Sequence, residues 1–154
     1  MRLLKPVVMI IPFLVFSGCS TVSIQEEHSQ GSTGLTNADV IYVKFIENIG
    51  GSWTVHVTVS HPDTGWDDYA NGWDVVLPDG EVIKPDDSTQ FTRTLLHPHV
   101  EEQPFTRSQS GIRIPPGITK VRVRAHDIID GFGGEEILVD LETASGNGYE
   151  VERQ

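Results

Sequence analysis

A strict alternation of apolar and polar residues constrains this chain more than any other feature. Within 52–60 every second residue is apolar, and these residues are Trp53, Val55, Val57 and Val59. Successive side chains of a β-strand point to opposite faces of a sheet, so the pattern predicts a strand with one buried face. Residues 120–126 and 137–141 repeat the alternation. No window has a helical period, and the chain is therefore predicted to be all-β.

Turn signals divide the chain into short strands. Further strand candidates lie at 40–47, 72–77, 81–84 continuing into 91–96, and 105–114. Clusters of Gly, Pro, Asn and Asp separate them, at 48–51, 78–80, 115–117 and 131–134. About seven short strands with regular turns indicate an antiparallel β-sandwich, which we place at residues 38–142. Residues 143–154 are expected to form a C-terminal tail.

The segment 114–127 resembles the end of a fibronectin type III or related immunoglobulin-like domain. A Pro-Gly turn at Pro116 and Gly117 leads into a strand of the form V-x-V-x-A at 121–125, followed by a Gly-rich hairpin. The tyrosine that usually opens this strand is missing, and Val121 stands near its place. The resemblance covers part of the domain and implies an immunoglobulin-like (fibronectin-III-like) β-sandwich. The strings 61–70, 96–108 and 123–127 also resemble a family of small exported bacterial proteins, which implies no activity.

The N-terminal segment has the features of an export signal. Two basic residues precede an apolar run at 7–16, which is about half the length of a membrane-spanning helix. Residues 1–18 are therefore predicted to be a signal peptide. Ser17 and Gly18 precede Cys19, and this sequence resembles a bacterial lipobox, in which the cysteine is acylated with palmitate and the chain is cut before it. The alternative is an ordinary secretion signal followed by a chance cysteine.

The residues after Cys19 indicate where the protein is held. Residues 19–37 lack apolar periodicity and are predicted to be a flexible tether. Ser20 stands where an Asp retains proteobacterial lipoproteins in the inner membrane, so the resemblance favours the outer membrane, facing the periplasm. The sequence thus predicts a protein of the cell envelope anchored to the membrane by an N-terminal lipid.

Composition and motifs exclude several functions. The chain has 11 Lys and Arg against 22 Asp and Glu, a net charge of −11, which argues against nucleic-acid binding. A single cysteine excludes an intramolecular disulfide and a multi-thiolate zinc site. The sequence has no Gly-x-Ser-x-Gly or His-Glu-x-x-His motif, and we expect no enzyme activity.

Strand direction predicts that unusual loops gather at one end. If 81–96 is a single arm with a bulge at 85–90, then the loops at 61–71, 97–104 and 127–134 share one end of the sandwich. Four histidines lie in these loops or at the strand end that leads into the last of them, and they are His61, His97, His99 and His126. If 85–90 is instead a full reversal, the loop at 97–104 moves to the opposite end.

The four histidines are candidate ligands for a metal ion. Pro98 favours an extended backbone at His97, so His97 and His99 are expected on one side of the chain, about 6.6 Å apart. The shell would be completed by His61, His126 or Asp63. Nitrogen and carboxylate donors without a thiolate favour Zn²⁺ or Cu²⁺.

Two other interpretations of these loops stay open. Asp63, Asp67 and Asp68 are candidate Ca²⁺ ligands, although they lack the EF-hand spacing. The histidines are otherwise hydrogen-bonding residues that hold the loops. In that case a hairpin centred near Gly131 pairs His126 with Glu136 across the strands, and His97 bonds to Glu101 or Glu102.

Aromatic residues in an Asp-rich loop indicate a contact surface. Trp66 and Tyr69 are the best candidates for exposed aromatic contacts, and Arg107 is a further candidate for the contact surface. The alternative is that they fold back as a hydrophobic lid. We therefore predict a non-catalytic protein-interaction or assembly module for an envelope partner, with divalent metal binding as the alternative function.

Overall fold

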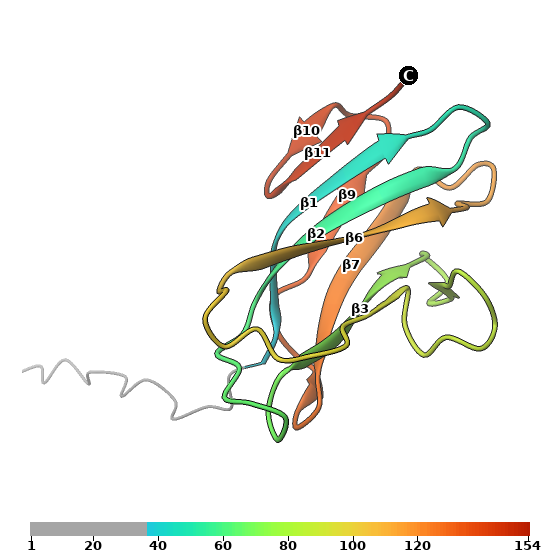
Figure 1. Cartoon of the computed structure of the whole chain (residues 1–154). Coiled ribbons are helices and arrows are strands. Elements are labelled where there is room, and N and C mark those ends of the chain that lie inside the picture. Colours follow the sequence, from blue (N-terminus) through green and yellow to red (C-terminus); the bar gives the residue numbers. More distant parts are fainter. Residues whose placement is uncertain (1–36) are drawn as a thin grey trace, which may run out of the picture. The chain divides into compact units, whose positions relative to one another are not determined.

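The computed structural model describes residues 37–154, and their only regular secondary structure is β-strand (Figure 1). The all-β prediction is confirmed. These residues contain no helix long and apolar enough to cross a membrane. The predicted signal peptide, Cys19 and all but the last residue of the predicted tether lie outside the described residues.

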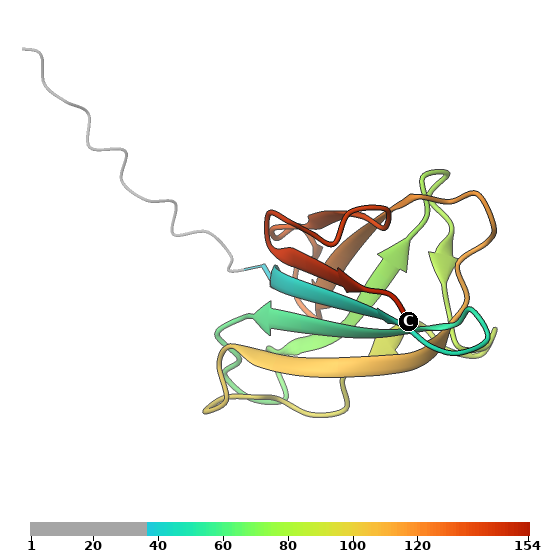
Figure 2. The same ribbon diagram turned by 90° about the horizontal axis from the view of Figure 1, so that it is seen from above.

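Two facing sheets make up the domain (Figure 2). In order across the first sheet, the strands are β10 (Ser145–Gly146), β11 (Tyr149–Glu152), β1 (Asp39–Glu47), β2 (Trp53–Ser60) and β6 (Phe105–Ile112). The second sheet has the order β4 (Val82–Ile83), β3 (Ala70–Val76), β7 (Lys120–Asp127) and β8 (Gly131–Phe132). In this second sheet β5 (Arg93–Thr94) also pairs with β3, and β9 (Ile137–Asp140) also pairs with β7.

The core lies between the two sheets and follows the alternation in the sequence. All four apolar residues of β2 named above are buried, and the polar residues between them are partly exposed. Val121, Val123 and Ala125 of β7 are buried in the same way from the opposite sheet. Burial of these apolar side chains is the main favourable contribution to folding.

The C-terminal residues belong to the sandwich, so the prediction of a tail at 143–154 is wrong. Strand β11 pairs with β1 in parallel, with Val43 opposite Tyr149 and Phe45 opposite Val151. Tyr149 and Val151 are buried in the common core. The sandwich therefore extends to the last strand, and it contains one parallel pair where an antiparallel arrangement was predicted.

The arm between β3 and β6 keeps one direction. Strands β4 and β5 both run antiparallel to β3, with Ile83 opposite Val75 and Thr94 opposite Gly72. The chain at 84–92 therefore bulges out between them and does not reverse.

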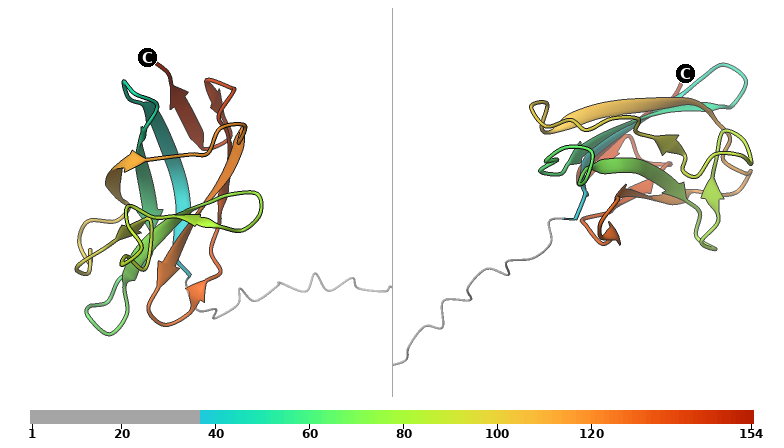
Figure 3. Two further views of the ribbon diagram at one scale, coloured as in Figure 1. Left: turned by 90° about the vertical axis from the view of Figure 1, so that its right-hand side faces the viewer. Right: turned by 60° about the horizontal axis from the view of Figure 1, so that its bottom comes forward.

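As a result, the loops 61–69 and 128–130 and the segment 95–104 lie at one end of the sandwich, as predicted. This is the lower end in Figure 1, brought forward on the right of Figure 3. We call it the loop end.

The register between β7 and the strands that follow it differs from the prediction. A short strand, β8, begins at Gly131 directly after the turn at 128–130, and His126 lies opposite Phe132. Strand β9 then pairs with the other half of β7. The predicted pair of His126 with Glu136 does not form, and Glu136 instead accepts a charge contact from Arg122, with Nε and Oε2 3.3 Å apart.

Candidate functional site

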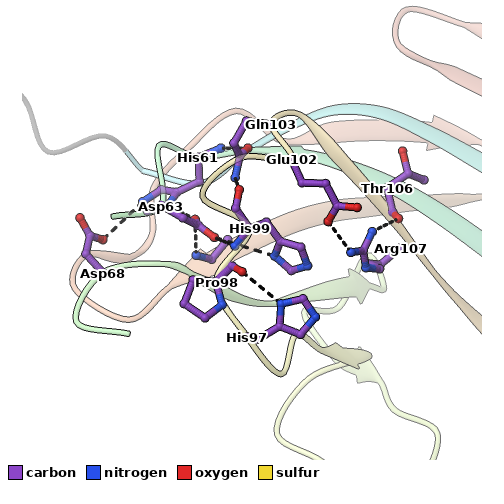
Figure 4. A network of polar contacts seen from close by, with 11 residues as sticks. His61, Asp63, Asp68, His97, Pro98, His99, Glu102, Gln103, Thr106 and Arg107 are labelled. Carbon is purple, nitrogen blue, oxygen red and sulfur yellow. Dashed lines mark hydrogen bonds and ion pairs between the residues drawn. The ribbon is translucent and has the colours of Figure 1, made fainter. Parts of the chain in front are cut away.

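A buried carboxylate joins two of the loops at the loop end (Figure 4). Asp63 is 5% exposed, and its Oδ1 accepts hydrogen bonds from the Ala70 backbone N–H at 3.0 Å and from His61 Nδ1 at 2.6 Å. Its Oδ2 accepts the backbone N–H of His99 at 2.6 Å. A buried charge is costly unless it is hydrogen-bonded, and both oxygens of Asp63 are satisfied in this way. Asp63 therefore fixes the segment 95–104 against the loop 61–69.

The hydrogen bond to Asp63 sets the orientation of His61. A neutral imidazole carries one N–H, and the bond from Nδ1 to the Asp63 carboxylate places that hydrogen on Nδ1. In the neutral ring Nε2 then carries the lone pair, and Nε2 lies 3.6 Å from Oδ1 of Asp68. The ring is buried, and the backbone N–H of His61 donates to Gln103 Oε1 at 3.0 Å. His61 is thus held rigidly with Nε2 directed at a carboxylate.

A third side chain, that of Asp127 at the end of β7, lies close to His61 and Asp68. Its Oδ1 accepts the backbone N–H groups of Ile129 at 2.9 Å and Asp130 at 2.6 Å. Its Oδ2 is buried and has no hydrogen-bond partner. One donor atom each from His61, Asp68 and Asp127 lies within 4.8 Å of the other two. Among residues 37–154, this is the only group of three or more such side chains with metal-site spacing.

His97 and His99 are neighbours, as predicted, but they do not share a third ligand. Their ring centroids are 4.5 Å apart. His99 is buried and stacks on Phe105 at 3.8 Å between centroids. Burial, followed by the positive charges of Arg107 and His97, lowers the pKa of His99. His97 is exposed, and its Nδ1 lies 3.1 Å from the carbonyl oxygen of Pro98, while its ring forms no hydrogen bond to Glu101 or Glu102.

His126 lies apart from the other histidines. Its Nδ1 is 2.6 Å from Oδ1 of Asn71, and its ring contacts Phe91 and Phe132 with centroids 5.0 and 4.7 Å away. Burial lowers the pKa of His126. Neighbouring residues of a strand face opposite sides, so the β7 side chain that meets His61 is Asp127, one position later. The structure therefore does not bring the four histidines to one point.

The three acidic residues of the loop do not form a shared site either. Both oxygens of Asp63 are occupied by hydrogen bonds, and Asp67 is exposed. Asp68 approaches His61 instead. The Ca²⁺ ligand set predicted from Asp63, Asp67 and Asp68 is not assembled in the described residues.

The predicted contact residues have different surroundings. Trp66 is 68% exposed and packs edge-on against Tyr69, with ring centroids 5.8 Å apart, so it is not a folded-back lid. Arg107 donates to Glu102 Oε2 at 2.7 Å, which lowers the pKa of Glu102. Its guanidinium also lies 5.5 Å from the centroid of the Phe105 ring. Arg107 therefore holds the segment 95–104.

The sequence analysis missed Asp127, although the sequence contains a signal for it. The apolar positions of the β7 segment are Val121, Val123 and Ala125, and the next inward position is Asp127. A carboxylate that continues the buried face of a strand has to be satisfied by hydrogen bonds or by a cation. This inward acidic residue is the feature that the prediction of a histidine cluster overlooked.

One comparison with known proteins finds a relative. Over 131 residues the chain is 34% identical to a protein of Halomicrobium mukohataei named "Putative lipoprotein". The match covers 85% of this chain and 61% of that protein, so the chain spans about three fifths of the length of its relative. No protein-family model matches the chain. No solved structure matches it.

Proposed function

We propose that this chain is a lipid-anchored protein of the cell envelope that acts by binding a partner protein and not by catalysis. The lipobox-like sequence ending at Cys19 supports the anchor, and so does the name of the 34% identical relative. Ser20 favours the outer membrane, with the sandwich in the periplasm. The lipobox-like sequence and Ser20 both lie in the part of the chain that precedes the sandwich.

The strand order supports an immunoglobulin-like class for the sandwich. In such domains the first, second and fifth strands share one sheet, and the third, sixth and seventh strands share the other. Here β1, β2 and β6 are neighbours in one sheet, and β3, β7 and β9 are neighbours in the second. The hairpin of β10 and β11 is an addition at the β1 edge. Domains of this class carry their binding residues on loops at one end.

The observation that carries the proposal is the concentration of exposed apolar side chains at the loop end. Five large ones come from its three loops, and they are Trp66, Leu96, Val100, Ile128 and Ile129. Aromatic and large aliphatic side chains provide most of the energy in protein interfaces. Exposed apolar groups gathered in one region mark an interaction site more often than scattered ones do.

Hydrogen bonds hold these loops in place before any partner binds. The backbone N–H of Ile128 donates to the carbonyl oxygen of Tyr69 at 3.2 Å, joining two of the loops. Asp63 joins the third loop to the first, as described above. Less conformational entropy is lost when a preorganised surface binds, so such loops favour tight binding.

Site-specific photocrosslinking in the native envelope tests the proposal. A photoreactive amino acid at position 66 is expected to trap a partner protein. The same amino acid at Ile49 provides the control, because Ile49 is 93% exposed and lies in the turn between β1 and β2, away from the loop end. With the partner identified, Trp66→Ala should weaken its binding about thirtyfold, as for a typical interface anchor. Equal crosslinking from both positions, or unchanged affinity of Trp66→Ala, would contradict the proposal.

A further inference from the structure

Among the described residues, no lysine or arginine forms an ion pair with Asp68 or Asp127, the two carboxylates that lie beside His61. Asp127 is fully buried, and its Oδ2 has no hydrogen-bond partner. An unpaired buried carboxylate oxygen is costly, and a bound cation is one of the few ways to satisfy it. Asp68 brings a second carboxylate to the same place. Asp63, two residues after His61, adds a third negative charge close by. The electrostatics of this position therefore favour a cation.

The imidazole of His61 is oriented as a metal ligand. Its Nδ1–H donates to Asp63, and in the neutral ring this leaves the lone pair of Nε2 on the side of Asp68. Metal-bound histidines almost always donate their other N–H to a carboxylate, a carbonyl or water, which fixes the ring and makes the ligating nitrogen more basic. Asp63 would serve as this positioning residue. Its other hydrogen bonds, from Ala70 and His99, fix its orientation, and Asp63 is not among the three side chains with metal-site spacing.

The donor types favour a zinc-like ion. Ligands of tetrahedral Zn²⁺ with bonds of about 2.1 Å are about 3.4 Å apart. His61 Nε2 and Asp68 Oδ1 are 3.6 Å apart, and the three donors lie within 4.8 Å of one another, so small side-chain movements would bring them onto one ion. An imidazole nitrogen suits Zn²⁺ better than Ca²⁺ or Mg²⁺, and both carboxylates are also acceptable to Zn²⁺.

We infer that His61, Asp68 and Asp127 bind a divalent transition-metal ion of the zinc type at the loop end. The side chain of Asp68 is 35% exposed and the other two are buried, so the ion would enter past Asp68. Three protein donors leave a fourth coordination position for water or for a donor from another molecule. The site would link the end of β2 to the end of β7, which belong to opposite sheets. This inference does not depend on the proposed partner protein.

Titration of the full chain, extracted in non-ionic detergent and stripped with EDTA, tests the inference. We expect isothermal calorimetry with ZnCl₂ to give one site per chain, and the midpoint of thermal unfolding to rise with Zn²⁺. Asp68→Asn and Asp127→Asn should each weaken Zn²⁺ binding at least tenfold. Asp67→Asn is the matched control, since it removes the same charge from the adjacent exposed residue and should bind like the unmodified chain.

Further measurements keep the inference falsifiable if Asp127→Asn unfolds. Asp68→Asn changes a partly exposed side chain, and its unfolding midpoint in EDTA is expected to match that of the unmodified chain. In ¹⁵N spectra, Zn²⁺ should shift the Nε2 resonance of His61 and leave that of His126 in place.

Four results would overturn the inference. They are absence of Zn²⁺ binding, unchanged binding in both Asn variants, loss of binding in His97→Ala, and tighter binding of CaCl₂ or MgCl₂ than of ZnCl₂. The first would mean that a proton on Nε2 of His61, and not a metal ion, balances the carboxylates.

Discussion

His99 has the least satisfied imidazole at the loop end. Both ring nitrogens are buried and have no hydrogen-bond partner within the protein, although the ring stacks on Phe105. Burial opposes the charged form of the ring, and the neighbouring Arg107 and His97 add repulsion, so the pKa of His99 is lowered from its ordinary value. The folded protein therefore resists protonation of this side chain more than the unfolded chain does.

We expect His99 to make the fold less stable in mild acid. Because its pKa in the folded state lies below the unfolded value of about 6.5, the unfolded chain binds more protons as the pH falls through this region. The contribution to the free energy of unfolding is complete above about pH 6.5 and is lost as the pH falls toward the lowered pKa. The lowered pKa of His126 acts in the same direction.

His99→Phe tests this pH dependence. Phenylalanine keeps the stacking on Phe105 and removes two unsatisfied nitrogens, so we expect a gain of about 1 kcal/mol in the free energy of unfolding at pH 8. The gain should be larger at pH 5, because the variant no longer takes up a proton at this position when it unfolds. Urea unfolding at pH 5, 6, 7 and 8 measures both effects. A variant whose stability falls with pH as steeply as that of the unmodified chain would show that His99 is not responsible.

At the scale of elements, alternation predicted the strands that have one buried face and one exposed face. This holds for β2 and β7, in which each apolar position of the pattern is buried. Strands β10 and β11 were missed because they are short and the Ser-Gly-Asn-Gly stretch at 145–148 reads as a turn. The parallel pairing of β11 with β1 joins the two ends of the domain, and no local pattern reports such a contact.

For the candidate site too, the sequence predicted the arrangement of the loops but not which side chains meet there. The direction of the strands was enough to bring the loops to one end, because β4 and β5 both run antiparallel to β3. Which side chains meet there depends on the register of β7 and on the insertion of β8. These two features place Asp127 against His61 and place His126 against Asn71 and the aromatic rings.

The pairing of β11 with β1 makes the C-terminal element part of the fold, and truncation tests its contribution. Deleting 143–154 removes the buried side chains of Tyr149 and Val151, each of which contributes about 1.5–3 kcal/mol. The deletion also removes the hydrogen bond from Arg153 Nη2 to the carbonyl oxygen of Leu141, at 2.9 Å. We expect the free energy of unfolding to fall by at least about 3 kcal/mol, a large part of the stability of a small domain.

Urea unfolding measures the loss caused by this truncation, and size-exclusion chromatography reports its second consequence. Without β11 the edge of β1 presents unpaired backbone groups, which favour self-association. Deleting Gln154 alone is the control, because this residue is exposed and lies after the last strand. A truncated chain that stays monomeric with an unchanged midpoint would mean that the first sheet is stable without its C-terminal strands.

At the scale of the whole molecule, the N-terminal residues of the first strand, β1, lie at the loop end of the sandwich. The backbone N–H of Val40 donates to the carbonyl oxygen of Glu135 at 2.8 Å, and Glu135 N–H donates to Asp39 Oδ1 at 2.7 Å. These bonds place the first residues of β1 beside the segment that follows β8. The predicted tether at 19–37 would therefore join the domain on the same side as the exposed apolar loops. An anchored Cys19 would therefore attach the domain to the membrane from its loop end.

The anchor itself can be tested through Cys19 in a bacterial host that processes lipoproteins. The full chain is expected to incorporate labelled palmitate and to enter the detergent phase of a Triton X-114 separation, since two or more acyl chains bind a membrane stably. Cys19→Ala removes the thiol that would carry the lipid, so the label should be lost and the protein should move to the aqueous phase. Ser20→Ala keeps the thiol and should remain labelled. If Cys19→Ala is labelled and partitions like the unmodified chain, the attachment lies elsewhere, and the loop end is not held to the membrane through this residue.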